Sequence, residues 1–285
     1  MVGLRFNTMT MITASIVLYK TIEKDLNMVL GCALKSEIEH IYVIDNSPTD
    51  ILRNIVCGLS EKVEYVYGQG NIGYGGAHNI GIKKAKKIHS DYHIVLNPDI
   101  YFGPKTITVI KDFMDSHKDV GLVLPKVIYP NGDLQYLCKL LPTPLDIFGR
   151  RFFPSKLKQK RNARFEMHEM GYDKIWNCPI LSGCFMFMRV SDLKRIGGFD
   201  ENFFMYFEDF DLMRRLHSVC KTVFFPYETI IHDHAAAHHT NKALLKASMK
   251  SAIQYFNKWG WLFDKERIIV NKHAFDDDNC INTDD

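Results

Sequence analysis

Apolar residues in the first half of the chain alternate between short runs and longer segments with a helical period. The short runs predict strands at residues 12–18, 40–44, 63–67, 92–96 and 121–124. The segments between them carry one apolar face and predict helices at 22–34, 76–90 and 106–116, the first capped by Thr21. Strands that alternate with helices indicate βαβ units, so we expect the α/β class, with a mostly parallel central sheet flanked by helices.

The second half of the chain follows a different pattern. Residues 139–176 are basic, aromatic and without a regular period, which predicts an irregular insert. Beyond it we expect strands at 183–190, 222–225 and 230–233, and helices at 191–197, 207–219 and 242–261. Acidic residues dominate after His273, and we therefore expect a disordered tail at 274–285.

Composition excludes several classes of protein. Hydrophobic residues make up 46% and charged residues 24% of the 285 residues, as in a globular protein with its own core. The net charge of +3 is too small to indicate nucleic acid as a partner. The seven cysteines are scattered and form no C-x-x-C pair, so they indicate neither a disulfide framework nor a zinc cluster. They favour a reducing, cytoplasmic setting.

The apolar stretch at 9–18 has two interpretations. A signal peptide is one, because Arg5 precedes the stretch and Ala14 lies within it. We favour a buried first strand, since the sequence continues straight into a helix start without a cleavage-like site. No stretch of the sequence reaches the roughly 20 apolar residues that span a bilayer, so any membrane contact is expected to be peripheral.

Polar residues follow three of the predicted strands, at the edge where α/β sheets bind their ligands. They are Tyr19 and Lys20, Asp45 and Asn46, and Asn97 and Asp99. The Asp45 carboxylate can accept a hydrogen bond from the imide N–H of uracil or thymine, but Asp-Asn-Ser is also an ordinary turn sequence. Asp99 can hold Mg²⁺ or Mn²⁺, because Pro98 ends the strand and leaves Asp99 on a loop. An Asn-Pro-Asp turn without a ligand is the alternative.

A glycine-rich loop at 70–81 leads into a predicted helix. Helix N-termini bind phosphate well, and small residues let the backbone approach it. The loop is no Walker sequence, because Ile82 rather than a lysine follows Gly81. It is no dinucleotide fingerprint either, because His78 takes the place of the last glycine. Taken alone, the loop favours a tight turn packed against the sheet.

Acidic residues cluster at 207–211, where a helix is predicted to begin. The helix dipole favours acids there, and Asp211 has an i,i+4 partner in Arg215, so a purely structural explanation exists. Glu208 and Asp209 have no such partner in the sequence. Either can serve as a general base that takes a proton from an acceptor hydroxyl, and an inverting transfer needs only one such base.

Two further clusters are open to more than one interpretation. Four histidines, His232, His234, His238 and His239, lie close together, and imidazole is a ligand of Mn²⁺ and Zn²⁺. For the last three we favour a surface cluster without metal. The basic and aromatic residues of 148–164 can rest on anionic lipid, meet a lipid-linked pyrophosphate, or form a solvated loop.

The order of these motifs resembles glycosyltransferase family 2, and within it the bacterial rhamnosyltransferase-like branch that builds O-antigen, capsule and related polysaccharides. The resemblance covers about residues 13–239. It rests on Val-Ile-Asp-Asn-Ser (43–47), Gly-Asn-Ile-Gly-Tyr-Gly (70–75), Leu-Asn-Pro-Asp (96–99), Ser-Gly-Cys-Phe-Met-Phe-Met-Arg (182–189), Gly-Gly-Phe-Asp through Glu-Asp-Phe-Asp-Leu (197–212) and Ile-His (231–232). The block at 197–212 is the most specific of these motifs.

This resemblance implies a single Rossmann-like GT-A domain at 1–275. Its nucleotide-sugar-binding half would lie at about 12–125 and its acceptor-binding half at about 126–265. The resemblance implies that Asp45 recognises the base, that Asp209 is the catalytic base with Glu208 beside it, and that Asp99 and His232 hold Mg²⁺ or Mn²⁺. The other donor-site residues would be Tyr19, Asn46, Asn71, Gly73, Asn79 and Asn97. Asn97 stands where the family's metal motif has Asp, a departure that bears on strict metal dependence.

The expected activity is the inverting transfer of a sugar from a nucleotide diphosphate donor to a saccharide hydroxyl. We expect dTDP-L-rhamnose as the donor, with UDP-galactofuranose or another UDP-hexose as the alternative. The expected acceptor is linked to polyprenyl diphosphate at the cytoplasmic face of the inner membrane.

Two rival functions are weighed against this activity. A sugar nucleotidyltransferase is disfavoured, because residues 18–22 contain no glycine-rich loop after the first strand. A non-catalytic nucleotide- or glycan-binding module is the rival of another class, and the presence of Asp99, Asp209 and His232 argues against it.

Overall fold

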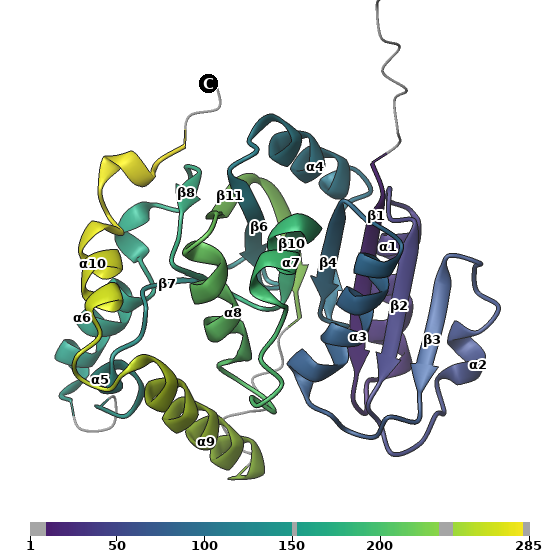
Figure 1. Cartoon of the computed structure of the whole chain (residues 1–285), viewed down its shortest axis with the longest axis horizontal. Coiled ribbons are helices and arrows are strands. Elements are labelled where there is room, and N and C mark those ends of the chain that lie inside the picture. Colours follow the sequence, from purple (N-terminus) through teal and green to yellow (C-terminus); the bar gives the residue numbers. More distant parts are fainter. Residues whose placement is uncertain (1–9, 150–152, 234–241, 282–285) are drawn as a thin grey trace, which may run out of the picture.

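The structure, a computed structural model, describes residues 10–149, 153–233 and 242–281. Its centre is a mixed sheet with strand order β3-β2-β1-β4-β10-β6-β11-β5, to which β8 adds by pairing with β11. The strands run through the middle of the molecule, with helices packed around them (Figure 1). The predicted α/β class with a central sheet flanked by helices is confirmed.

Four parallel strands form the first half of the sheet. In sheet order they are β3 (Val63–Tyr67), β2 (His40–Asp45), β1 (Ile12–Leu18) and β4 (Tyr92–Leu96). Every residue of β1 is buried, because helices pack on both faces of the strand. Ile16 belongs to the same apolar cluster as Leu26 of α1 (Glu23–Leu34), whereas Val17, which points the opposite way, clusters with Ala77 of α3 (Tyr74–Lys87).

The second half of the sheet is mixed, with parallel and antiparallel pairs. β10 (Phe185–Arg189) lies antiparallel between β4 and β6 (Val120–Ile128). β11 (Lys221–His232) then runs parallel to β6. Short strands complete this half: β5 (Ile100–Tyr101) and β8 (Trp176–Asn177) pair antiparallel with β11, and β7 (Cys138–Lys139) pairs with β9 (Ile180–Leu181) in a separate small sheet.

Helices alternate with the strands along the chain in the residues that the structure describes. They are α1 (Glu23–Leu34), α2 (Arg53–Val56), α3 (Tyr74–Lys87), α4 (Thr106–Ser116), α5 (Pro144–Ile147), α6 (Ser155–Phe165), α7 (Val190–Ile196), α8 (Glu208–His217), α9 (Lys242–Trp259) and α10 (Lys265–His273), with 3₁₀ turns at His168–Met170 and Asp277–Asn279. None of the helices described is long and apolar enough to cross a membrane.

A chain of buried polar groups joins β1, β4 and α3. Ser15 Oγ lies 2.7 Å from His78 Nδ1 and 2.9 Å from His93 Nε2, and Thr13 Oγ1 lies 2.8 Å from His93 Nδ1. Burial lowers the pKa of His93 to about 3 and the pKa of His78 well below its ordinary value. Both imidazoles are therefore neutral at physiological pH and hold the helix to the sheet by hydrogen bonds.

An ion pair fixes α10 to α8. The Arg214 guanidinium donates to both carboxylate oxygens of Asp264 at 2.7 and 2.6 Å, and the two side chains are 2% and 3% exposed. Asp264 also caps α10 by accepting a hydrogen bond from the backbone N–H of Arg267 at 3.0 Å. The bidentate geometry holds the C-terminal helices against the site-bearing half of the molecule.

Several elements have the predicted bounds, among them β1, β3, β4 and α4. The prediction that Thr21 caps the first helix is wrong, because α1 begins at Glu23 and its N-cap residue Ile22 offers no side-chain acceptor. The two strands predicted at 222–225 and 230–233 form one strand, β11, with an irregularity between Phe225 and Thr229.

The predicted irregular insert and disordered tail also differ from the structure. The insert at 139–176 contains α5 and α6; the latter is built from good helix formers such as lysine, leucine and glutamine, but buries only Phe165 and so shows no apolar stripe. Residues 274–281 are ordered, since Ala274 is buried, Cys280 pairs with Trp176, and Ile281 N–H donates to Ile175 O at 3.0 Å. The predicted helix at 242–261 ends at Trp259, and α10 follows it.

Candidate active site

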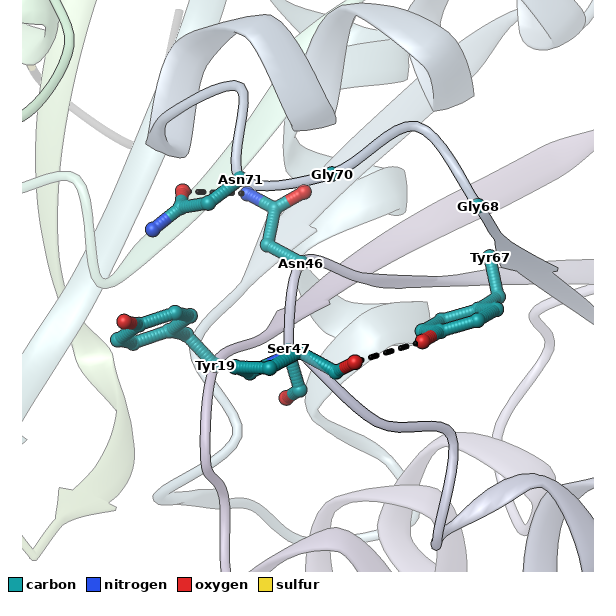
Figure 2. Close-up of a pocket in the computed structure, with 8 residues that line it drawn as sticks. Tyr19, Asn46, Ser47, Tyr67, Gly68, Gly70 and Asn71 are labelled. Atoms are coloured by element: carbon teal, nitrogen blue, oxygen red, sulfur yellow. Dashed lines mark hydrogen bonds between the residues drawn. The ribbon is translucent and has the colours of Figure 1, made fainter.

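A pocket of about 290 Å³ opens at the carboxyl ends of β1, β2 and β3. Its lining residues are Tyr19, Asn46, Ser47, Pro48, Tyr67, Gly68, Gly70 and Asn71. Figure 2 shows the rings of Tyr19 and Tyr67 on opposite sides of the pocket, with Asn46 and Asn71 along one edge. Aromatic rings and amide groups in this arrangement suit a flat, polar heterocycle, and this edge is where parallel α/β sheets bind their ligands.

Side-chain amides hold the pocket loops to one another. Asn46 Nδ2 donates to the backbone oxygen of Gly73 at 3.1 Å and to Asn71 Oδ1 at 3.4 Å. Gln69 Nε2 donates to Asn46 Oδ1 at 3.2 Å and to the backbone oxygen of Asp45 at 2.8 Å. The loop after β3 is thereby fixed to the end of β2, so the pocket is largely pre-formed.

Asp45 stands behind the pocket and is 1% exposed. One carboxylate oxygen accepts from the backbone N–H of Ser47 at 2.8 Å, and the other accepts from the Tyr65 hydroxyl at 2.6 Å. Arg53 lies over the Tyr65 ring, with its guanidinium carbon 5.1 Å from the ring centroid. Asp45 therefore shapes the turn that presents Asn46 and Ser47 to the pocket but does not itself line the pocket, which differs from the predicted role in recognising the base.

The glycine-rich loop contacts the segment before α8 at Gly73. This residue has φ +81°, and a Cβ added to it would lie 2.2 Å from the backbone oxygen of Phe204. The same Phe204 oxygen accepts a hydrogen bond from Tyr74 N–H at 3.0 Å. Glycine is required here because it adopts positive φ and lets the two backbones touch. This contact brings the start of α3 against the segment before α8.

Tyr74 connects the loop to two other parts of the site. Its hydroxyl lies 2.7 Å from the backbone oxygen of Gly183 and 3.0 Å from Asn97 Oδ1. Burial raises its pKa well above the ordinary tyrosine value, and nearby acidic groups, among them Cys184, Asp209 and Asp99, raise it further. The Tyr74 phenol is therefore neutral and lies between the loop after β4 and the start of α8.

Asp99 and His232 are brought together by the pairing of β5 with β11. The pairing sets Ile100 opposite His232, and His232 Nε2 lies 3.4 Å from Asp99 Oδ1. Gln135 orients the imidazole, because its Oε1 lies 3.0 Å from His232 Nδ1 and its Nε2 donates to the His232 backbone oxygen at 2.8 Å. Burial lowers the pKa of His232, but Cys184 and Asp99 outweigh burial and raise it to about 10.

This pair has the character of a divalent-cation site. Asp99 Oδ1 is buried and faces His232 Nε2, which carries a proton at neutral pH because the pKa of His232 is raised, so a cation bound by both side chains would displace this proton. Within the described ranges, no group of three or more His, Cys, Asp or Glu side chains is placed to enclose a metal ion. Mg²⁺ and Mn²⁺ suit a site with few protein ligands, since substrate phosphates and water complete their coordination.

Glu208 and Asp209 begin α8 and differ in environment. Glu208 is 5% exposed, and its Oε2 has no hydrogen-bond partner among the described residues. Burial and the neighbouring Asp209 charge raise the pKa of Glu208 well above its ordinary value. Burial also raises the pKa of Asp209, but the positive charge of Lys139 and the backbone N–H groups of Phe210 and Gly183 oppose this rise. Asp209 is therefore ionised first as pH rises.

Asn79, another predicted donor-site residue, also lies away from the pocket. Asn79 is buried within α3, and its Nδ2 donates to the Phe199 backbone oxygen and to Glu201 Oε1, both at 2.9 Å. Its Oδ1 accepts from Phe199 N–H at 2.9 Å. All of its hydrogen-bonding groups are thus used to tie α3 to the turn before α8. This placement differs from the predicted role in donor binding.

The other predicted residues converge on one edge of the sheet. Tyr19, Asn46 and Asn71 line the pocket. Gly73 accepts a hydrogen bond from Asn46, and Asn97 Oδ1 lies within hydrogen-bond distance of the Tyr74 hydroxyl. Asp99 lies next to His232. His234, His238 and His239 fall outside the described residues. Sequence reasoning missed Tyr67, Tyr74, Gln135 and Lys139. Tyr67 ends a predicted strand and could have been found by that position, whereas nothing in the sequence pairs Gln135 with His232.

Comparison with known proteins matches residues 16–197 to the family model described as glycosyl transferase family 2. The N-acetylglucosaminyl-diphospho-decaprenol L-rhamnosyltransferase of Mycobacterium tuberculosis is 27% identical over an alignment 238 residues long, and the alignment covers 74% of this chain and 75% of that protein. The rhamnosyltransferase WbbL of Escherichia coli K12 is 26% identical over an alignment 251 residues long, and the alignment covers 84% of this chain and 88% of that protein.

Solved structures show the same fold at lower identity. The crystal structure of GalNAc-T7 with UDP, GalNAc and Mn²⁺ superposes with a TM-score of 0.61 at 13% sequence identity. The superposition covers 86% of this chain and 48% of that chain. At this identity the likeness concerns the fold alone.

We predict that alanine is tolerated far better at Gly70 than at Gly73. Both glycines have positive φ, but a Cβ on Gly70 meets nothing within 4 Å. Gly70→Ala should lower the free energy of unfolding by about 1–2 kcal/mol through left-handed strain alone. Gly73→Ala should lower it by at least about 3 kcal/mol, because the contact with Phe204 must open. Urea unfolding measures both variants, and equal losses would contradict the close approach described at Gly73.

Proposed function

Because the chain belongs to glycosyl transferase family 2, we propose that it transfers L-rhamnose from dTDP-L-rhamnose to a hydroxyl group of a lipid-linked saccharide. The chain is a glycosyltransferase with the GT-A fold. The donor is proposed from the two relatives, since both are named as rhamnosyltransferases and align over 74% and 84% of this chain. The Mycobacterium tuberculosis relative's name includes a diphospho-decaprenol acceptor, which supports a lipid-linked acceptor here.

One observation carries the proposed assignment of the site. Tyr74 lies at the meeting point of the glycine-rich loop, the Asn97–Asp99 loop and the start of α8. A nucleotide in the pocket of Tyr19, Asn46 and Asn71 would extend its diphosphate toward Asp99, because all three strand ends lie at one edge of the sheet. The sugar would then lie between Asp99 and Asp209.

Asp209 is proposed as the general base. Its carboxylate would take the proton of the acceptor hydroxyl as that oxygen forms a bond to the anomeric carbon of the sugar. The bond from the anomeric carbon to the diphosphate oxygen breaks, and the nucleotide diphosphate leaves with the electron pair. Attack from the face opposite the leaving group inverts the anomeric configuration.

The neighbours of Asp209 have distinct proposed roles. Glu208, with its raised pKa, would stay protonated and leave Asp209 as the ionised member of the pair. Lys139, which lies over the Phe210 ring at 5.6 Å, would keep Asp209 ionised and attract the acceptor's diphosphate. Asp99 and His232 would hold Mg²⁺ or Mn²⁺, which when bound would neutralise charge on the departing diphosphate.

Removal of the proposed base should separate transfer from donor binding. We predict that Asp209→Asn lowers the transfer rate by at least about 100-fold, because an amide cannot accept the acceptor's proton. Donor affinity, measured by titration calorimetry, should change less than about twofold, since the pocket is untouched. Glu201→Gln, which alters an exposed carboxylate near the same segment, serves as the control with near-normal rate. A transfer rate in Asp209→Asn within tenfold of the wild type would contradict the assignment.

The charge of Lys139 should appear in the pH profile of transfer. Transfer needs ionised Asp209, so kcat/KM falls as pH decreases through the Asp209 pKa. Lys139 lowers that pKa, and therefore Lys139→Met should move the acidic limb of the profile to higher pH. Lys139→Arg keeps the charge and should leave the limb in place. A limb that stays fixed in Lys139→Met, or moves to lower pH, would contradict this electrostatic role.

A further inference from the structure

Helix α9 has a buried face and an exposed apolar stripe. Ala252, Tyr255 and Phe256 are fully buried against Phe203 and Phe207. On another face, Leu245, Met249 and Ile253 are 45%, 41% and 44% exposed. Their spacing of four residues aligns them along the helix, so they form one apolar stripe toward solvent. A stripe of this kind on a helix that is already packed on its other side indicates a binding surface.

The same helix is basic throughout. Its sequence has lysines at positions 242, 246, 250 and 258 and contains no aspartate or glutamate. Lys246 and Lys250 are exposed, and each follows a residue of the apolar stripe. α6 likewise carries Lys156, Lys158, Lys160, Arg161 and Arg164 with no acidic residue. In Figure 1, α5, α6 and α10 lie at the end of the molecule opposite β3, and α9 runs toward them.

The turn between α9 and α10 presents two more apolar side chains. Leu262 and Phe263 are 74% and 95% exposed. The turn is nevertheless held in place, because Arg267 donates to the backbone oxygens of Gly260 at 3.2 Å and Trp261 at 3.0 Å. The ion pair of Asp264 with Arg214 fixes its far end. A rigid turn that exposes a phenylalanine side chain almost completely indicates that this side chain belongs to a binding surface.

We propose that the apolar stripe of Leu245, Met249 and Ile253, with Lys246, Lys250 and the Leu262–Phe263 turn, docks on an anionic lipid bilayer. A helix with an apolar stripe, adjacent lysines and no acidic residue matches the chemistry of a bilayer surface, where acyl chains lie beneath negative headgroups. A protein partner would need acidic side chains placed opposite the exposed lysines, whereas a bilayer attracts lysines through the negative charge spread over its headgroups.

Docking on α9 would place the active site beside the bilayer. Ser251 Oγ donates to the backbone oxygen of Met205 at 2.8 Å, and the Tyr255 ring packs on Phe207 at 5.5 Å. The segment that α9 supports leads directly into Glu208 and Asp209. This part of the inference rests on the proposed function, since a lipid-linked acceptor carries its diphosphate at the bilayer surface.

Flotation with lipid vesicles tests the surface in the absence of donor and acceptor. The full chain is mixed with vesicles of phosphatidylglycerol and phosphatidylcholine, or of phosphatidylcholine alone. Binding is expected to the anionic vesicles, to fall roughly tenfold at 0.5 M NaCl, and to be weak without phosphatidylglycerol. Lys246→Glu with Lys250→Glu should weaken binding at least about tenfold, since each lysine near the surface contributes about fivefold.

Two sets of serine variants identify the surface. Leu245→Ser with Met249→Ser and Ile253→Ser should weaken vesicle binding at least about tenfold while the unfolding temperature stays within a few degrees. Ile22→Ser with Ile51→Ser removes exposed apolar side chains on the other half of the molecule and should bind vesicles as the wild type does. Equal binding by the two sets would overturn the proposal.

A second copy of the chain is the competing occupant of the stripe. A wild type that sediments as a dimer, becomes monomeric in the stripe variant and does not float with anionic vesicles would overturn the bilayer proposal. Transfer to a water-soluble saccharide acceptor is measured in parallel. A stripe variant that transfers sugar at the wild-type rate but no longer binds vesicles would support the proposed surface. Absence of transfer by the wild-type protein would count against the proposed function alone.

Discussion

The site depends on the single antiparallel strand in the centre of the sheet. β10 runs opposite to β4 and β6, so its first residue, Phe185, pairs with the last residue of β4, Leu96. The loop before β10 is therefore brought to the same edge as the carboxyl ends of the parallel strands. Gly183 in that loop contacts Tyr74 on one side and Asp209 on the other. With a parallel β10, this loop would lie at the far edge of the sheet, and Gly183 could not contact Tyr74 and Asp209.

The acidic residues at this edge of the sheet have different electrostatic environments. Asp99 faces His232, whereas Glu208 and Asp209 lie near Tyr74 at the start of α8. Burial raises the pKa of both adjacent carboxyls, but the Asp209 charge raises the pKa of Glu208 further, whereas Lys139 and backbone N–H groups oppose the rise at Asp209. The carboxylates at this edge of the sheet therefore lie in two separate electrostatic environments, one beside His232 and one at the start of α8.

Sequence reasoning reached the parts of the structure that local patterns specify. Apolar runs gave the bounds of β1 and β4, and the polar residues that follow them, Tyr19 and Asp99, lie at the site edge. Long-range contacts could not be predicted this way. Asn79 sits in a motif near the pocket residues, yet its amide is committed to Phe199, more than a hundred residues away in the sequence. α6 escaped detection because its surface is polar all round, and the order of residues 274–281 depends on pairing with Trp176.

Ligand-dependent thermal unfolding tests the central claim most directly, namely that this edge binds a nucleotide sugar together with a divalent cation. The chain is heated with dTDP-L-rhamnose, UDP-hexoses or GDP-mannose, each with and without Mn²⁺. A ligand present at a hundred times its Kd adds about 2.7 kcal/mol to the free energy of unfolding. The account predicts a concentration-dependent rise of the midpoint with dTDP-L-rhamnose that is larger with Mn²⁺. An unchanged midpoint with every nucleotide sugar, with or without the metal, would contradict it.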